Sequence, residues 1–184
     1  MSTPFSRRNL FRLRLGDWVH LARETRAQPQ GEAPAPFRPP GASPVEVEFL
    51  ATCERCGACA QACPYGVIEK LGPLGGIAEG TPVLNPESNP CHWCPDMPCI
   101  QACPSGALAR LPGRMRIGLA ALDLDRCLNR QGILCDTCAL HCPASVGAIT
   151  MKRREPQIDA DRCVGCGLCA FHCEAQPSAF AVQR

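Results

Sequence analysis

The chain has 184 residues, of which 16 are cysteines and 19 are prolines, while aromatic side chains make up only 5%. This composition excludes a conventional apolar core, because small domains so poor in large apolar side chains usually fold around disulfides or metal. The formal net charge is +2, but cysteines that bind metal as thiolates would make the chain acidic, which excludes a nucleic-acid partner that needs a basic face.

Residues 1–48 contain no cysteine. A basic segment, SRRNLFRLRLGDWVHLARETR, covers residues 6–26 and is followed by AQPQGEAPAPFRPPGASP, a proline- and alanine-rich stretch typical of an extended linker. We therefore expect residues 1–48 to form a basic arm and linker, and residues 49–184 to form the folded domain. Three interpretations of the basic segment stay open: an arm that docks on a partner, a peripheral membrane contact, or a degenerate export signal.

The start of the basic segment, SRRNLF, resembles a twin-arginine export motif. The residues that follow include Arg12, Arg14 and Asp17, where an export signal has an uncharged apolar stretch. We therefore expect a cytoplasmic protein, with membrane association as an open alternative. No span of the sequence approaches the roughly twenty apolar residues that a membrane helix needs.

Short apolar runs flank the cysteine-containing segments from residue 45 onward. Their lengths fit brief strands that close hairpins. The runs before these segments include VEVEFL (45–50), IGLAALDL (117–124) and PQIDAD (156–161), and the runs after them are YGVIE (65–69), SGALA (105–109), VGAIT (146–150) and SAFAV (178–182). Between the runs we expect a cysteine loop that leads into a short helical turn.

The cysteines form four groups of four, whose first members are Cys53, Cys91, Cys127 and Cys163. The steps between these positions are 38, 36 and 36 residues, which indicates an internal repeat. The first group, CERCGACAQACP, has the spacing C-x2-C-x2-C-x3-C-P of bacterial [4Fe–4S] proteins, in which the fourth cysteine binds the other cluster of a pair. Three thiolates on a tight loop reach three irons of one cube, and the proline fixes the direction in which the chain leaves.

The other groups are variants of this pattern. The second group has four residues between its second and third cysteines, and the third group has seven between its first and second. The fourth group repeats the first spacing with Glu174 in place of proline, either as a tolerated turn residue or as a carboxylate that lowers a cluster potential. The candidate ligands are Cys53, Cys56, Cys59, Cys63, Cys91, Cys94, Cys99, Cys103, Cys127, Cys135, Cys138, Cys142, Cys163, Cys166, Cys169 and Cys173.

Zinc and disulfides are the alternatives to iron–sulfur clusters. Zinc sites usually combine two CxxC pairs across a longer spacer, and disulfides within consecutive CxxC loops would be strained. Four oxidised cubanes with their thiolates add about −8 to the charge, so we expect a loaded protein near −6. We expect Trp93 to pack against a cluster, and His92, His141 and His172 to lie beside clusters or at the surface rather than to bind iron.

Three segments together resemble the NapG/MauM-type ferredoxins over about residues 50–182: GTPVLNPESNPCHWCPDMPCIQACPSGAL, DRCLNRQGILCDTCALHCPASVGAIT and DRCVGCGLCAFHCEAQPSAF. The longer loop of the second group also resembles iron–sulfur subunits of molybdoenzymes of the dimethyl-sulfoxide-reductase kind, and the N-terminus looks like that of NapF. The resemblance implies an α+β, tandem bacterial-ferredoxin-like fold. In it, short β-hairpins, short helices and a small apolar core surround two pseudo-twofold pairs of clusters.

The wider resemblance also implies a nested pairing, in which group one exchanges its fourth cysteine with group four, and group two with group three. The four ligand sets would then be Cys53, Cys56, Cys59 and Cys173; Cys91, Cys94, Cys99 and Cys142; Cys127, Cys135, Cys138 and Cys103; and Cys163, Cys166, Cys169 and Cys63. Spacing alone does not fix this pairing, and a sequential exchange stays open.

The sequence contains no GxGxxG or P-loop motif, and we expect an electron carrier without a catalytic site of its own. The resemblance implies that four [4Fe–4S] clusters relay single electrons to or from a redox enzyme. That partner would be a molybdoenzyme such as periplasmic nitrate reductase, or a quinol-oxidising membrane protein. The alternative is a cytoplasmic maturation factor, whose residues 1–30 bind an apo-molybdoenzyme before its export.

Overall fold

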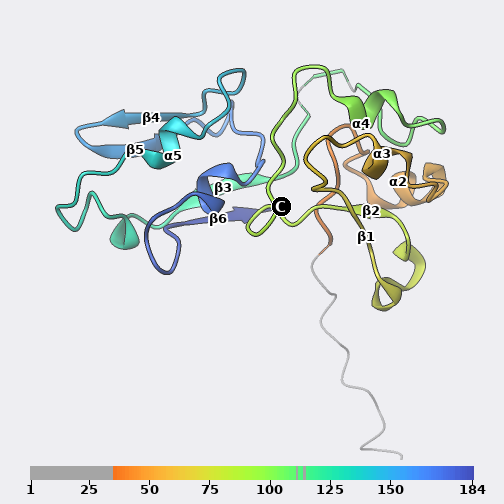
Figure 1. Cartoon of the computed structure of the whole chain (residues 1–184), viewed down its shortest axis with the longest axis horizontal. Coiled ribbons are helices and arrows are strands. Elements are labelled where there is room, and N and C mark those ends of the chain that lie inside the picture. The colour runs from red at the N-terminus through yellow and green to blue at the C-terminus, as the bar shows by residue number, and fades with distance from the viewer. Residues whose placement is uncertain (1–34, 111, 114) are drawn as a thin grey trace, which may run out of the picture. The chain divides into compact units, whose positions relative to one another are not determined.

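Short helices and short strands, joined by long loops, make up the computed structural model of the chain (Figure 1). The structure describes residues 35–110, 112–113 and 115–184. The predicted basic arm, with its membrane-contact and export interpretations, lies outside the described residues. Residues Pro36–Arg184 form one compact unit. We call residues 36–110 its first half and residues 115–184 its second half.

A four-residue helix follows the second cysteine of every group and contains the third cysteine. These helices are α3 (Ala58–Gln61), α4 (Pro98–Gln101), α5 (Thr137–Leu140) and α6 (Leu168–Phe171). Two of them begin after a glycine in the left-handed region, Gly57 at φ 81° and Gly167 at φ 93°. Glycine has no Cβ to clash there, so it turns the cysteine loop sharply into the helix. No helix in the described part of the chain is long and apolar enough to cross a membrane.

The remaining helices lie outside the cysteine loops. Helix α2 covers Glu46–Thr52, and two 3-10 helices cover Pro73–Ala78 (η2) and Leu124–Arg126 (η3). In η3 the cap residue Asp123 accepts a hydrogen bond from the amide of Asp125, which satisfies one of the donors left free at a helix start.

Three antiparallel strand pairs complete the part of the fold that the structure describes. In the first half, β1 (Glu69–Lys70) pairs with β2 (Pro82–Val83). In the second half, β3 (Leu119–Leu122) pairs with β6 (Phe180–Gln183), and β4 (Ile149–Lys152) forms a hairpin with β5 (Glu155–Ile158). Figure 1 shows β1, β2 and α2–α4 together on one side and β3–β6 with α5 on the other.

The two halves repeat one arrangement. In the second half, β3 precedes group three and pairs with β6, which follows group four, while the β4–β5 hairpin lies between the two groups. In the first half, Ala42 precedes group one and bridges to Leu108 after group two, while β1 and β2 lie between the groups. Each half therefore closes around two consecutive cysteine groups, which is a small α+β arrangement.

The predicted strands agree with the structure mainly in the second half. The runs at 117–124, 146–150, 156–161 and 178–182 each contain part of a strand. In the first half, only Glu69 of the run 65–69 is in a strand, and the run 105–109 contributes only the bridge at Leu108.

The prediction of a strand at VEVEFL is wrong, because these residues form most of α2. Val45 and Val47 are exposed and Phe49 is 1% exposed, so the alternating valines do not define a buried strand face. Two glutamates, Glu46 and Glu48, lie in the first turn, where negative charge stabilises a helix.

The core is small and contains many cysteines. One cluster of buried side chains joins both halves, including Phe49, Ile68 and Leu108 from the first half and Ile117 and Val164 from the second. A second cluster lies within the second half around Phe180 and Val182. The buried cysteines of the two clusters are Cys59, Cys91, Cys99, Cys127, Cys138, Cys163, Cys166 and Cys169.

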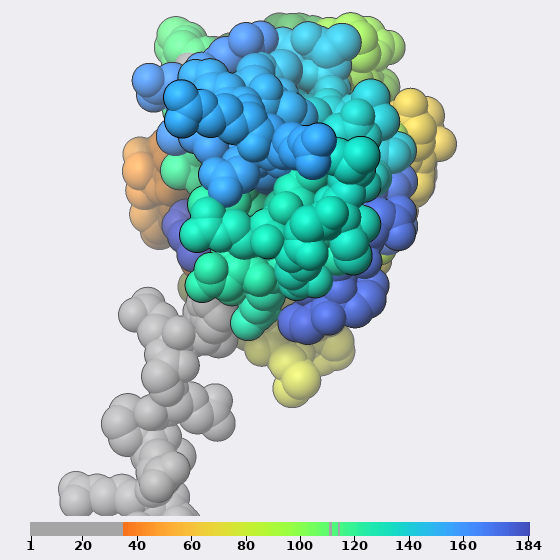
Figure 2. Space-filling view, turned by 90° about the vertical axis from the view of Figure 1, so that its left-hand side faces the viewer, coloured from red at the N-terminus to blue at the C-terminus, as the bar shows by residue number. Residues whose placement is uncertain are grey.

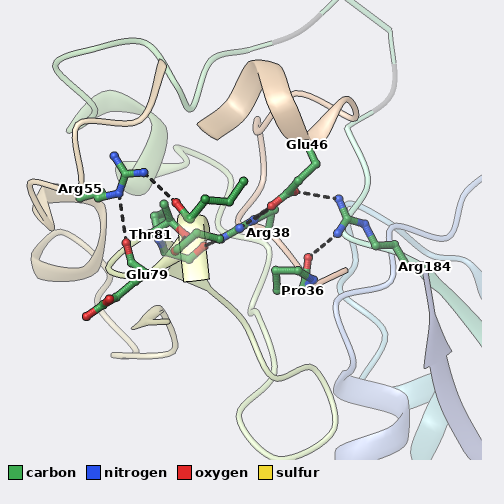
Figure 3. A network of polar contacts seen from close by, with 10 residues as sticks. Pro36, Arg38, Glu46, Arg55, Glu79, Thr81 and Arg184 are labelled. Atoms are coloured by element: carbon green, nitrogen blue, oxygen red, sulfur yellow. Dashed lines mark hydrogen bonds and ion pairs between the residues drawn. The ribbon is translucent and has the colours of Figure 1, made fainter. Parts of the chain in front are cut away.

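Residues 36–48 belong to the folded unit, so the predicted boundary at residue 48 lies too far along the chain. Phe37 bridges to Leu84, and Arg38 is only 4% exposed. The Arg38 guanidinium donates to the hydroxyl of Thr81, to the backbone carbonyl of Pro82 and to the Glu46 carboxylate (Figure 3). These contacts tie the proline-rich stretch to the first half.

Candidate metal centres

The sixteen cysteines line four separate pockets, with four cysteines in each. We number each pocket by the group that supplies three of its cysteines. The first pocket has Cys53, Cys56, Cys59 and Cys103; the second has Cys91, Cys94, Cys99 and Cys63; the third has Cys127, Cys135, Cys138 and Cys173; and the fourth has Cys163, Cys166, Cys169 and Cys142. All sixteen thiols are free of disulfides.

This arrangement differs from the nested pairing that the wider resemblance implied. The structure brings Cys103, and not Cys173, to the first group, and it brings Cys142, and not Cys63, to the fourth group. The pockets therefore bring together cysteines of neighbouring groups rather than the nested sets, which favours a sequential exchange. The physical reason is helix packing: α3 lies against α4, and α5 lies against α6, so each fourth cysteine meets the loop of its sequence neighbour.

Each fourth cysteine follows directly on the short helix that holds the third. The amides of Cys63, Cys103, Cys142 and Cys173 each donate to the carbonyl three residues earlier, at 3.2–3.4 Å. The helix turn therefore ends at that residue, and the fourth thiol lines a different pocket from the third. This geometry explains why a spacing of three residues recurs in all four groups.

Backbone amides donate to the sulfurs of three of the fourth cysteines. The amide nitrogens of Leu108, Ala148 and Ala179 lie 3.4, 3.3 and 3.3 Å from the sulfurs of Cys103, Cys142 and Cys173. These donors lie in the apolar runs after the groups, which the sequence indicated only as strands. An amide that points at sulfur favours the thiolate, which is the form that binds metal.

Amide and hydroxyl donors lower the pKa of the Cys103 thiol. Burial raises the pKa of this thiol, but the Leu108 amide and the Ser105 hydroxyl outweigh burial and lower its pKa below the usual value. Ser105 Oγ lies 3.7 Å from the sulfur. The donors around the Cys103 sulfur therefore favour its thiolate form.

At seven other cysteines burial outweighs such donors and raises the pKa, among them Cys59 and Cys94. Burial raises the pKa of Cys91 to about 12 and the pKa of Cys99, Cys138 and Cys166 to about 11, and it also raises the pKa of Cys169. Neighbouring thiolates add to this cost by repulsion. Thiolates crowded into one partly buried pocket therefore need a cation to balance them, and a metal core supplies it.

The donor set fits iron–sulfur clusters. Among the described residues, no group of three or more His, Cys, Asp or Glu side chains converges closely enough to hold a single metal ion. A cubane does not need this convergence, because each thiolate binds a different iron. Four thiols around each pocket are the number that one [4Fe–4S] core requires.

The pockets differ in exposure. Cys163, Cys166 and Cys169 of the fourth pocket are all buried, whereas Cys56 of the first pocket is exposed. The insertion loop of group three carries Ile133 and Leu134, which are 54% and 72% exposed. Figure 2 shows the face of the second half on which this teal-coloured part of the chain lies at the surface.

The two longer loops have their own supports. In group three, Asn129 closes the insertion loop, because its side chain donates to the carbonyl of Cys135 and accepts from the Cys135 amide at 3.2 Å. In group two, Met97 is 5% exposed and lines the second pocket with Pro98. Neither role was predicted, although an asparagine inside a seven-residue gap is a signal for a side chain that closes a turn.

Arg55 fixes the first loop. Its side chain donates to the carbonyls of Glu79 at 3.1 Å and Ile77 at 3.0 Å (Figure 3). These bonds hold the end of η2 beside the pocket that Arg55 itself lines.

The ring side chains beside the cysteines stack on one another. His92 stacks on Tyr65 and His141 stacks on His172, each at 3.6 Å between ring centroids. Both stacks join the loops of two groups that exchange cysteines. Trp93 is partly buried and packs against the core, and Glu174 lines the third pocket.

Comparison with known proteins agrees with this geometry. The chain matches the model of the 4Fe-4S dicluster domain over residues 52–107 and that of the 4Fe-4S binding domain over residues 156–176. The dicluster match contains both groups one and two, which the structure places together.

Several curated proteins are similar to most of the chain. Ferredoxin-type protein NapG of Haemophilus influenzae is 39% identical over 80% of this chain and 58% of its own length. Methylamine utilization ferredoxin-type protein MauM of Paracoccus denitrificans is 42% identical over 71% of the chain and 63% of its own length. Ferredoxin-type protein NapF of Escherichia coli is 33% identical over 71% of the chain and 76% of its own length. The chain thus spans about three-fifths of these NapG and MauM proteins.

Proposed function

Because the chain belongs to the ferredoxin-type iron–sulfur proteins that include NapG, MauM and NapF, we propose that it carries four [4Fe–4S] clusters and transfers single electrons. The observation that carries this proposal is the division of sixteen cysteines into four pockets of four. A bound [4Fe–4S] cluster supplies reversible one-electron transfer without forming or breaking a bond to a substrate.

The proposed ligand sets follow the pockets, as two pairs related by the repeated arrangement of the halves. They are Cys53, Cys56, Cys59 and Cys103; Cys91, Cys94, Cys99 and Cys63; Cys127, Cys135, Cys138 and Cys173; and Cys163, Cys166, Cys169 and Cys142. The cysteine side chains hold the irons, and the amides of Leu108, Ala148 and Ala179 stabilise the thiolates. The apolar walls keep water from the buried sulfurs.

We propose that the chain is an electron carrier without its own catalytic reaction. Its partner would be a redox enzyme, such as a molybdoenzyme or a quinol-oxidising membrane protein. The longer second loop supports the molybdoenzyme, since it resembles the loop of molybdoenzyme iron–sulfur subunits. The MauM relatives are named for methylamine utilization, and we propose a comparable accessory role for this chain beside a redox enzyme.

Analysis of the anaerobically purified protein tests the cofactor. Four clusters predict about sixteen irons and sixteen sulfides per chain, broad absorbance near 400 nm, and an EPR signal that develops on reduction. About four zinc ions per chain with no absorbance in that region would disprove the proposal.

The second candidate is a maturation factor that acts in the cytoplasm. The match to NapF, which the chain covers over 76% of the relative's length, favours it. On this proposal, residues 1–30 bind an apo-enzyme. Deletion of residues 1–30 should then abolish association with the apo-enzyme while leaving the iron content and electron transfer intact. Loss of electron transfer alone would contradict the maturation role, and unchanged association would show that the arm is not needed.

A further inference from the structure

The second and fourth pockets touch through their own cysteine residues. The backbone amide of Cys91, in the second pocket, donates to the backbone carbonyl of Cys166, in the fourth pocket, at 3.0 Å. The two residues come from different halves of the molecule.

Close backbone packing fixes this contact. A Cβ atom on Gly167 would lie 1.9 Å from the carbonyl oxygen of Pro86, so only glycine lets the fourth loop approach the segment before Cys91. Another bond crosses between the halves nearby, from the amide of Val182 to the carboxylate of Glu87 at 3.2 Å. The second and fourth loops therefore hold a defined position relative to each other.

The first and third loops lack this connection. Among the recorded backbone hydrogen bonds of the described residues, the amides of residues 53–63 and 127–142 donate only within their own halves. Their pockets also have the more exposed surroundings, at Cys56 and at the Ile133–Leu134 loop. The fourth pocket, by contrast, has three buried cysteines and no exposed cysteine.

We propose that the four sites lie in the order first, second, fourth, third, and that electrons pass between the halves where Cys91 contacts Cys166. This order rests on the proposed function. At the crossing, the second site is oxidised by one electron and the fourth is reduced by one, or the reverse, with no proton or bond change. The order along the molecule therefore differs from the order along the sequence, and the first and third sites are the two ends.

Removal of one site at a time distinguishes the two orders. In the proposed order, loss of the fourth site leaves the third without a neighbour, whereas loss of the third isolates none. In the sequence order, loss of the third site isolates the fourth, and loss of the fourth isolates none. An isolated reduced cluster gives a narrow EPR signal without magnetic coupling, whereas neighbouring reduced clusters broaden each other.

The matched variants are the double substitutions Cys163→Ala/Cys166→Ala and Cys127→Ala/Cys135→Ala. Each should retain about twelve irons. After full reduction of the anaerobic holoprotein by a low-potential reductant, the fourth-site variant should show the uncoupled signal and the third-site variant should not. The reverse result would overturn the proposed order. Absence of iron–sulfur absorbance in the wild-type protein would instead overturn the proposed function.

A gentler pair of variants decides the question if the fourth-site variant does not fold. Gly167→Ala forces the contact with Pro86 apart, while Gly106→Ala places the same methyl group at φ +70° with nothing within 4 Å. We expect Gly167→Ala to keep about sixteen irons and to lose part of the coupling, with Gly106→Ala resembling the wild type. Two results would contradict the proposed crossing. One is a Gly167→Ala protein that keeps its iron and has the EPR spectrum of the wild type. The other is a Gly167→Ala protein that loses only the clusters of one half while the magnetic coupling between the remaining clusters does not change.

Discussion

Arg38 and Glu46 form an ion pair in which the guanidinium is almost fully buried and the carboxylate is partly buried, with side-chain exposures of 4% and 29%. Arg184 contacts the same carboxylate at 3.3 Å and also donates to the carbonyl of Pro36 (Figure 3). One glutamate of α2 therefore contacts both Arg38 of the proline-rich stretch and Arg184, the residue that follows β6. Burial of Arg38 requires this charged partner, because an unpaired buried charge is strongly destabilising.

The first prediction concerns the pH dependence of stability at Glu46. Burial raises its pKa, but the bonds and charges of Arg38 and Arg184 outweigh burial, so the pKa in the folded protein lies below 4.5. A lowered pKa stabilises the folded state above the unfolded value, and this contribution is lost as the pH falls through the folded value. Glu46→Gln should reduce the free energy of unfolding by about 1–3 kcal/mol at pH 7 and weaken the loss of stability below pH 4.5.

Denaturant unfolding of the anaerobic protein between pH 3.5 and 7 measures this effect. Glu48→Gln is the control, because Glu48 lies on the same helix but is exposed and accepts a hydrogen bond from Ser43. Equal pH profiles for the two variants would show that the ion pair does not carry the acid sensitivity.

The second prediction concerns Asn129, which holds Cys135 by two hydrogen bonds. Asn129→Ala removes both bonds, so the third site should lose iron first. Removal of a hydrogen-bond partner of a metal ligand typically lowers the metal affinity by about 10–100-fold. Iron released to a chelator should rise by about four atoms per chain, while Gln131→Ala, on the same loop, should behave like the wild type. Equal release from both variants would argue against this role of Asn129.

The third prediction concerns the potential of the first site. Ser105→Ala removes the hydroxyl near the Cys103 sulfur, and a donor to a ligand sulfur favours the more negative, reduced state. One hydrogen bond contributes about 1 kcal/mol, so the midpoint potential should fall by something on the order of tens of millivolts. Redox titration followed by EPR measures the shift. The control is Ser145→Ala, at an exposed serine in the loop that follows group three. This substitution should leave all midpoint potentials unchanged.

The fourth prediction concerns Glu174, which lines the third pocket. It follows the last cysteine of group four, where the three other groups have proline. Glu174→Gln removes a negative charge, which should raise the potential of the third site. Glu174 is exposed, so added salt should reduce the difference between variant and wild type. A salt-independent difference would point to a change in packing rather than in charge.

The sequence identified the cysteines that line the pockets, but not which groups share a pocket. Four groups with cubane spacing identified all sixteen cysteines that line the pockets, because the spacing follows from how a loop wraps a cube. The spacing also indicated that a fourth cysteine leaves its own group, but not where it goes. That depends on which short helices pack together, α3 with α4 and α5 with α6, and such long-range packing leaves no local signal.

Two other features were hidden for different reasons. The stretch FRPPGAS has the composition of a linker, yet Arg38 within it is buried. Its partners Glu46 and Thr81 lie outside the stretch, so the composition of the stretch does not reveal the contacts that bury Arg38. VEVEFL alternates as a strand does, but its valines face solvent and Phe49 alone is buried. Periodicity could not separate these cases, since only the tertiary contacts decide which side is covered.

The exchange of cysteines between neighbouring groups has a consequence for synthesis of the chain. The first two ligand sets are complete once Cys103 has been added, before any of the second half exists. With the nested sets, the site begun by Cys53 would have waited until Cys173 of the fourth group had been added. The emerging first half thus contains every thiol that lines its two pockets. On the proposed function, it can mature as a unit while the ribosome is still adding the second half.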